Sequence, residues 1–109
     1  MSDEERLEQR KEFREVVNMS PQELEDWLAT EESRAVGDSD DGESTGHASG
    51  RRIVEIQRRT VDELTDDDYG HMNEVVGYVH RHLAQRPDGD VTDTRWRWSL
   101  MNWGHDPLA

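Results

Sequence analysis

Apolar residues recur at helical spacing in the second half of the chain. Five of them follow one another at intervals of 3, 4, 3 and 4 residues: Tyr69, Met72, Val76, Val79 and Leu83. This spacing places them on one face of a helix. The run Thr-Asp-Asp-Asp at 65–68 predicts the start of that helix, with Thr as N-cap and acids in the first turn. Gly77 lies inside the stripe, where glycine costs roughly 1 kcal/mol relative to Ala, so we expect another backbone to approach closely there.

The first third of the chain predicts two more helices. Residues 3–18 carry acids at the start and a short apolar stripe near the end, with Asp3 as the expected cap. Because the first turns are almost wholly charged, residues 1–10 are expected to fray. The run Ser-Pro-Gln-Glu at 20–23 has Ser as N-cap, Pro in the first position and Glu in the third, which predicts a second helix. That helix is expected to end within residues 30–35.

The rest of the chain predicts a loop and two helices. Residues 37–50 contain four Gly and no large apolar residue, which favours a loop. Apolar positions predict a third helix over residues 49–64, running up to the 65–68 cap. Residues 86–90 form a turn, and a last short helix is expected over residues 92–103, with Gly104 ending it.

No stretch alternates between apolar and polar residues as a strand does. The sequence therefore predicts an all-α, compact single domain, residues 1–109, of four to five helices with a long Gly/Asp/Ser loop before the third. The helix that carries the central stripe is expected to pack against seven apolar residues of the other helices: Leu24, Trp27, Leu28, Ile53, Ile56, Trp96 and Leu100.

Composition adds a strong acidic excess. The 109 residues include 26 Asp and Glu against 13 Lys and Arg, a net charge of −13, and twelve of the thirteen basic residues are Arg. Surplus carboxylates with scarce Lys suggest adaptation to molar salt, where the Debye length is about 3 Å and repulsion is screened. The alternative explanation is that the protein is acidic and rich in Arg only because of the base composition of its genome. The lack of cysteine, of a signal-peptide core and of a run of about 20 apolar residues favours a soluble cytoplasmic protein and excludes disulfides and thiol catalysis.

Metal binding and catalysis find little support. His71, His80 and His82 share one predicted helix, yet no two of them can bind one ion, because they either point apart or lie about 16 Å apart along the axis. Surface or capping roles are therefore expected, and no metal or cofactor is predicted. Ser44 and Ser49 are near His47 in sequence, but no third group holds a base in place, so we expect no enzymatic activity.

Arginine pairs are the best candidates for binding. Arg51-Arg52 and Arg58-Arg59 are seven residues apart, so their members stack on the same helix faces. One interpretation is a solvated face, with Glu55 pairing to Arg59.

The other interpretation is an anion site at the start of the predicted helix. Gly46 to Gly50 would bring His47, the Ser49 hydroxyl and free backbone N–H groups next to the first arginine pair. The anion would be a nucleic-acid phosphate, a free phosphate or the chain's own acidic residues 38–43.

A second candidate surface combines aromatic and basic residues near the end of the chain. Arg95, Trp96, Arg97 and Trp98 follow one another directly. Trp96 shares a helix face with Trp103, which suits the core, whereas Trp98 lies on another side. An exposed Trp98 beside Arg97, with Arg95 nearby in the same run, would stack on a base or contact a protein partner.

Four segments resemble one small family, the domain of unknown function 3140. They are SPQELEDWL (20–28), GHASGRRIVEI (46–56), YVHRHLAQRP (78–87) and DTRWRWSLMNWGHDPL (93–108). The resemblance covers nearly the whole chain after about Lys11, and the Asn-Trp-Gly-His-Asp-Pro ending is its most specific part. Members occur in genomes of salt-loving microbes and some carry an automated DNA-binding label. No binding or catalytic residues are established for the family, so the resemblance implies none here.

Two functions follow from these observations. The first is a non-enzymatic, nucleic-acid-associated protein, with DNA as the candidate partner, that uses the Arg-rich second half. The net charge of −13 opposes this, because non-specific binding depends on phosphate neutralisation. The second is a protein-interaction or stress-accessory domain without nucleic-acid binding. In either case no membrane contact is expected, and the protein is expected to be a monomer or weak dimer.

Overall fold

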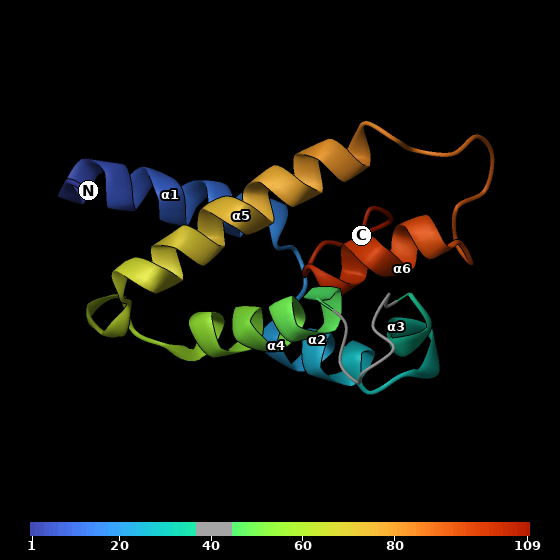
Figure 1. Cartoon of the computed structure of the whole chain (residues 1–109), viewed down its shortest axis with the longest axis horizontal. Helices are drawn as coiled ribbons and strands as arrows, with labels where there is room; N and C mark the ends of the chain where they lie inside the picture. Colours follow the sequence, from blue (N-terminus) through green and yellow to red (C-terminus); the bar gives the residue numbers. More distant parts are fainter. Residues whose placement is uncertain (37–44) are drawn as a thin grey trace.

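The computed structural model describes residues 1–36 and 45–109, whose regular structure is entirely helical (Figure 1). Its elements in chain order are α1 (Asp3–Val16), α2 (Pro21–Leu28), α3 (Glu31–Ala35), α4 (Thr45–Arg58), the 3₁₀ turn η1 (Val61–Glu63), α5 (Asp66–Leu83) and α6 (Arg95–Asn102). The predicted all-α class is confirmed. The α-helices of the described part number six because α3 is separate from α2.

Helix starts follow the local capping rules. Ser20 and Thr65 each form a capping box with the residue three positions later, Glu23 and Asp68, as predicted. The Thr30 side chain accepts a hydrogen bond from Ser33 N and starts α3, which is why the predicted second helix divides there. α1 is capped by Ser2 and α6 by Thr94, one or two residues from the predicted positions.

The predicted bounds of the third helix are wrong at both ends. α4 begins at Thr45 rather than near Ser49 and ends at Arg58, six residues before Leu64. The Gly-rich half of the predicted loop is therefore helical. The reason is tertiary packing, since Gly50 lies inside the core: a Cβ added there would be 2.5 Å from the backbone oxygen of Asn102 and 2.8 Å from Leu28 Cδ2. The predicted acidic segment 38–43 lies outside the described residues.

The close backbone approach expected at Gly77 is not present. A Cβ there would meet only the side chain of Arg81, at 2.9 Å from Nη1. α5 therefore has no backbone of another element close to Gly77, and the close approach of two backbones occurs instead at Gly50 of α4, next to Asn102.

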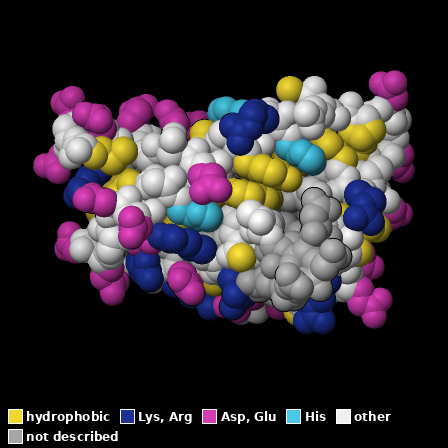
Figure 2. Space-filling view, viewed as in Figure 1, with side chains coloured by type: hydrophobic (Ala, Val, Ile, Leu, Met, Phe, Trp, Pro, Cys, Tyr) yellow, Lys and Arg dark blue, Asp and Glu magenta, His cyan; other side chains and the backbone are white. Residues whose placement is uncertain are grey.

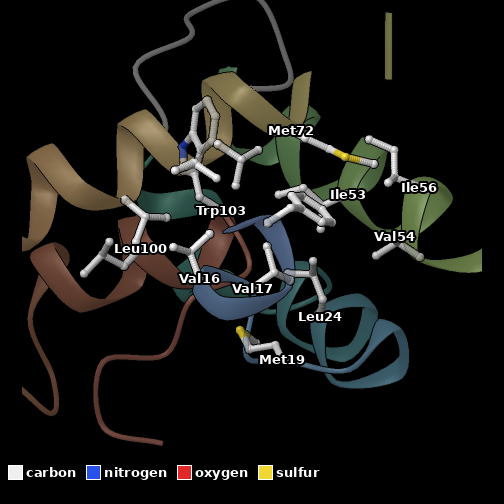
Figure 3. Packing of buried hydrophobic residues seen from close by; sticks show 14 of the residues in the cluster. Val16, Val17, Met19, Leu24, Ile53, Val54, Ile56, Met72, Leu100 and Trp103 are labelled. Atoms are coloured by element: carbon white, nitrogen blue, oxygen red, sulfur yellow. The ribbon is translucent and has the colours of Figure 1, made fainter. Parts of the chain in front are cut away.

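The helices pair across the chain. α1 packs along α5, α2 packs along α4, and α6 fits against α2, α3, α4 and α5. One cluster of buried residues joins these elements, and Figure 3 shows part of it around Ile53, Met72 and Trp103. The predicted core partners are buried in this cluster except Trp27, which is partly buried against it, and Leu83 of the stripe is also only partly buried.

The segment after α6 is fastened to the end of α1. Gly104 takes a positive φ of 80° and ends α6, as predicted, with His105 N donating to Leu100 O at 3.0 Å. Asn18 Nδ2 donates to Asp106 O at 2.9 Å, and Asp106 N donates to Asn18 Oδ1 at 2.7 Å. The charged first turns of α1 also contact α5, since Arg6 pairs with Asp66 and Arg10 donates to the Tyr69 hydroxyl.

Candidate functional site

The arginines of α4 bind carboxylates of the same molecule. Arg59 Nη1 donates to both oxygens of Asp68, at 2.8 and 2.7 Å, and Arg52 Nη2 lies 3.4 Å from Asp68 Oδ1. Arg58 pairs with Glu25 of α2. The predicted i,i+4 pair between Arg59 and Glu55 is present at 3.9 Å. These contacts match the salt-bridged interpretation of the α4 surface.

Asp68 is the centre of this charge network. Its side chain is 1% exposed, and Oδ2 accepts a hydrogen bond from Thr65 N at 3.0 Å. Burial alone would raise the pKa of Asp68, but the hydrogen bonds from Thr65 N and Arg59 outweigh it and hold the pKa below its ordinary value. Two arginines therefore meet an anion that α5 itself supplies.

The predicted anion site at residues 46–52 rests on a helix start that the structure places elsewhere. Because α4 begins at Thr45, its free N–H groups belong to residues before Arg51 and Arg52. His47 Nε2–H donates to Leu28 O at 2.8 Å, and the Ser49 hydroxyl lies 3.0 Å from His71 Nε2. Ser49 is buried, so its hydroxyl faces the core rather than a ligand at the surface.

The arginines of α6 are also engaged. Arg97 makes a two-pronged contact with Asp106, at 3.1 Å from Nε to Oδ1 and 3.0 Å from Nη2 to Oδ2. Burial would raise the pKa of Asp106, and the hydrogen bond from Arg97 more than compensates and lowers it. Arg95 Nη2 donates to Ala35 O at 2.7 Å, and Trp98, which follows Arg97, is partly buried.

Five aromatic rings form a column between α5 and α6, which was not among the features predicted from the sequence. The stack runs from His71 to Trp103, Tyr78, His82 and Trp96, with ring centroids 6.2, 4.2, 5.3 and 6.1 Å apart and planes within 16°. Arg86 lies over the outer end, 5.5 Å from the Trp96 ring centroid. Figure 2 shows hydrophobic side chains and histidines together over this region, while Asp and Glu crowd the ends of the molecule. The signal in the sequence that could have indicated the column is the helical spacing of positions 71, 78, 82 and 86, which places them on one face.

Four histidines connect elements of the fold. His47 and His105 cap the carbonyls of Leu28 and Val16, the last residues of α2 and α1, which agrees with the expected capping role. His71 and His82 are instead partly buried within the column. Within residues 1–36 and 45–109, no group of three His, Cys, Asp or Glu is placed to hold a metal ion.

Burial sets the charge state of the two column histidines. It lowers the pKa of His71 more than Glu74 raises it, and Arg52 lowers it further. Burial also lowers the pKa of His82, against the hydrogen bond to Trp96 O. Both rings are therefore neutral at pH 7, which suits stacking against tryptophan.

A groove of about 410 Å³ lies between α2 and α4. Its apolar lining comes from Leu28, Ala29 and Val54. Charged side chains of both signs surround this lining: Glu25, Arg51, Glu55 and Arg58. The groove can hold an apolar side chain while its rim contacts both positive and negative groups.

Comparisons with known proteins identify one family. In the described part of the chain, no helix has the length and apolar character needed to cross a membrane. No curated protein and no solved structure matches the sequence. Residues 12–101 match the family described as protein of unknown function DUF3140, so most of the chain lies within the match, including both arginine pairs of α4 and every ring of the aromatic column except Trp103. The chain therefore belongs to the DUF3140 family.

Proposed function

We propose that this chain is a non-enzymatic protein-interaction domain whose partner docks in the groove between α2 and α4. The observation that carries the proposal is the rim of the groove, where Glu25 and Glu55 stand beside Arg51 and Arg58 around an apolar lining. A protein segment with an apolar anchor and charges of both signs complements such a surface. A polyanion would meet the two glutamates as well as the arginines. Cytoplasmic location and adaptation to high salt belong to the same proposal.

The pairing of the arginines also favours a protein partner over nucleic acid. Arg52, Arg58, Arg59 and Arg97 each contact a carboxylate of the chain, so a phosphate would have to displace Asp68, Glu25 or Asp106. Each such carboxylate would also repel the phosphate, and the net charge is −13. Nucleic-acid binding remains the rival function, because the Arg52, Arg58 and Arg59 side chains are 42%, 50% and 38% exposed.

Blocking the groove tests the proposal. Ala29 is exposed at the end of α2 and lines the groove, so Ala29→Arg would place a long side chain in it. Ala84→Arg is the matched control, because Ala84 is exposed, ends α5 and has the same right-handed backbone conformation. Tagged wild type and both variants are used to capture partners from a high-salt extract of the source cells, with and without nuclease. We expect a nuclease-resistant partner that wild type and Ala84→Arg retain and Ala29→Arg loses.

A duplex-binding assay decides between the two functions. Fluorescence anisotropy of a labelled DNA duplex is measured with wild type and with the double variant Arg58→Glu/Arg59→Glu at several salt concentrations. We expect no binding even at modest salt. Binding that weakens linearly in log affinity against log salt, and that the double variant loses, would overturn the proposal in favour of the rival. A partner that both groove variants retain would also overturn it.

A further inference from the structure

A second cavity, of about 250 Å³, lies where α1, the start of α2, the end of α4, η1 and α5 meet. It shares no lining residue with the α2–α4 groove, and none of its lining residues adjoins residues 37–44. Figure 1 shows α1 alongside α5 at the end of the molecule opposite α6. The cavity has apolar, amide and cationic lining residues: Phe13, Pro21, Ile56, Val61, Leu64, Met72, Gln57, Arg10, Arg14 and Arg59.

The charged residues that line this cavity are all positive, although the net charge of the protein is −13. Among the described lining residues three are Arg and none is Asp or Glu. Arg59 already pairs with the buried Asp68 and with Glu55. Arg10 and Arg14 therefore supply the positive charge that the cavity offers to a ligand.

Arg10 and Arg14 belong to a stripe of arginines along α1. Arg6, Arg10 and Arg14 follow one another at intervals of four residues, which places them on one face of the helix. The same helix carries six acidic residues, yet none of them lies three or four positions from Arg10 or Arg14. Because like charges at this spacing repel each other, negative groups from outside the helix would stabilise the stripe.

The rest of the fold supplies a carboxylate at only one end of this stripe. Arg6 pairs with Asp66 at 2.7 Å, whereas Arg10 Nη1 donates to the uncharged hydroxyl of Tyr69 at 2.8 Å. Within residues 1–36 and 45–109, the Arg14 guanidinium makes no ion pair. An anion in the cavity would meet Arg10 and Arg14 together, and planar guanidinium groups match the two oxygens of a carboxylate.

The inner wall of the cavity is apolar, while its charged residue Arg14 is at the surface. Phe13, Ile56 and Met72 are buried, whereas Arg14 and Val61 are exposed. A ligand with an apolar chain would remove that chain from water, and its charged end beside Arg14 would keep part of its hydration. The volume lies below the usual range of small-molecule sites, about 300–1,000 Å³, so the chain must be short.

We propose that this cavity binds a short monocarboxylate with an apolar chain, such as a short fatty acid. Its carboxylate would lie beside Arg10 and Arg14, and its chain would contact Phe13, Ile56 and Met72. A carboxylate is favoured over a phosphate because the smaller head group leaves more of the cavity to the chain. The proposal concerns residues outside the α2–α4 groove and does not depend on the function proposed for that groove.

The methyl group of Met72 reports binding at the inner wall. In protein labelled at the methionine methyl groups, a carbon–proton correlation spectrum gives one signal for each of the four methionines, assigned by replacing Met19, Met72 and Met101 with Leu in turn. Hexanoate is the probe at pH 7, where it is ionised. 1-Hexanol carries the same chain without the charge, and acetate carries the charge without the chain. We expect the Met72 signal to shift and saturate at millimolar hexanoate, and hexanol and acetate to bind at least about tenfold more weakly.

Two arginine variants localise the carboxylate. Arg14 is exposed and Gln has a similar helix propensity, so Arg14→Gln should fold, and we expect it to weaken hexanoate binding at least about fivefold. Arg81→Gln is the matched control, because Arg81 is also exposed and helical but lies outside the cavity, and it should bind as wild type does. Far-UV circular dichroism checks that both variants are folded.

Several results would overturn the proposal. They are the absence of a saturable Met72 shift, hexanol or acetate binding as tightly as hexanoate, and equal weakening by the two variants. Unchanged binding by Arg14→Gln would also overturn it, and Arg14 would then serve only the negative end of the α1 dipole. If Arg14→Gln does not fold, the comparison of hexanoate with hexanol and acetate on wild type still decides.

Discussion

The role of Gly50 gives a prediction in which the sign of the effect is decisive. An alanine methyl group at this position would lie 2.5 Å from the Asn102 carbonyl oxygen and 2.8 and 3.1 Å from the two methyl groups of Leu28. A contact with backbone cannot be relieved by rotating a side chain, so α4 must move away from α6. Overpacking of this kind costs about 1–3 kcal/mol, and the short distance places Gly50→Ala near the upper end. Replacing glycine in a helix returns about 1 kcal/mol, so the net loss of stability is about 2 kcal/mol.

Gly70→Ala supplies the control for that calculation. Gly70 is also helical and exposed, and no atom lies within 4 Å of its added Cβ, so only the gain in helix propensity applies. We expect Gly70→Ala to stabilise the protein by about 0.5–1 kcal/mol. Urea unfolding followed by far-UV circular dichroism, at one fixed salt concentration, measures both variants. If Gly50→Ala is as stable as wild type or more stable, the close approach of α4 to Asn102 is refuted.

Four other perturbations have definite expected outcomes. Val76→Asp buries an unpaired charge in the core, so we expect a loss of about 4 kcal/mol or more and no cooperative thermal transition; a folded variant would contradict the packing of α5. Asp68→Asn removes the charge that pairs with Arg59 and should cost about 2 kcal/mol in urea unfolding, an effect that would be absent if the pair were only a surface contact. Burial lowers the pKa of His71 and His82 in the folded protein, so the unfolded chain binds protons at a higher pH than the folded one, and the free energy of unfolding should be full above pH about 6.5 and fall as the pH drops below it. His71→Gln should flatten this decrease, and an unchanged profile would exclude His71 as its source. Helicity should rise from low salt towards molar KCl if the acidic excess is an adaptation, and full folding at low salt would remove that explanation.

Local sequence rules were sufficient where a helix start or face depends on nearby residues. Ser20 and Thr65 are followed three positions later by acids that complete a capping box, and α5 carries its apolar stripe at regular spacing. The start of α4 could not be predicted in this way. Gly46 and Gly50 have low helix propensity, and only the contact of Gly50 with Asn102, 52 positions away in the chain, explains why glycine is needed inside a helix.

In the candidate site, too, features set by nearby residues could be predicted from the sequence and features set by distant contacts could not. The sequence identified the arginine pairs and the local partner of Arg59, Glu55, but not the distant acids, because Arg58 pairs with Glu25 across 33 positions and Arg52 with Asp68 across 16. These partners become neighbours only when α4 packs against α2 and α5. The aromatic column depends on inserting Trp103 between His71 and Tyr78 of α5 and on placing Trp96 against His82 at the outer end. The spacing along α5 was visible, but the intercalation requires the position of α6.

The junction between the end of α1 and the segment after α6 has a consequence for folding kinetics. Asn18 and Asp106 exchange two hydrogen bonds across 88 positions, and His105 binds Val16 O across 89. Closing so long a loop brings little reward until both ends are in place, so we expect this junction to form late, after the transition state for folding. Contacts that form after the transition state mainly retard unfolding. Asn18→Ala should therefore accelerate unfolding and leave the folding rate nearly unchanged, which makes the junction a determinant of how long the native state persists.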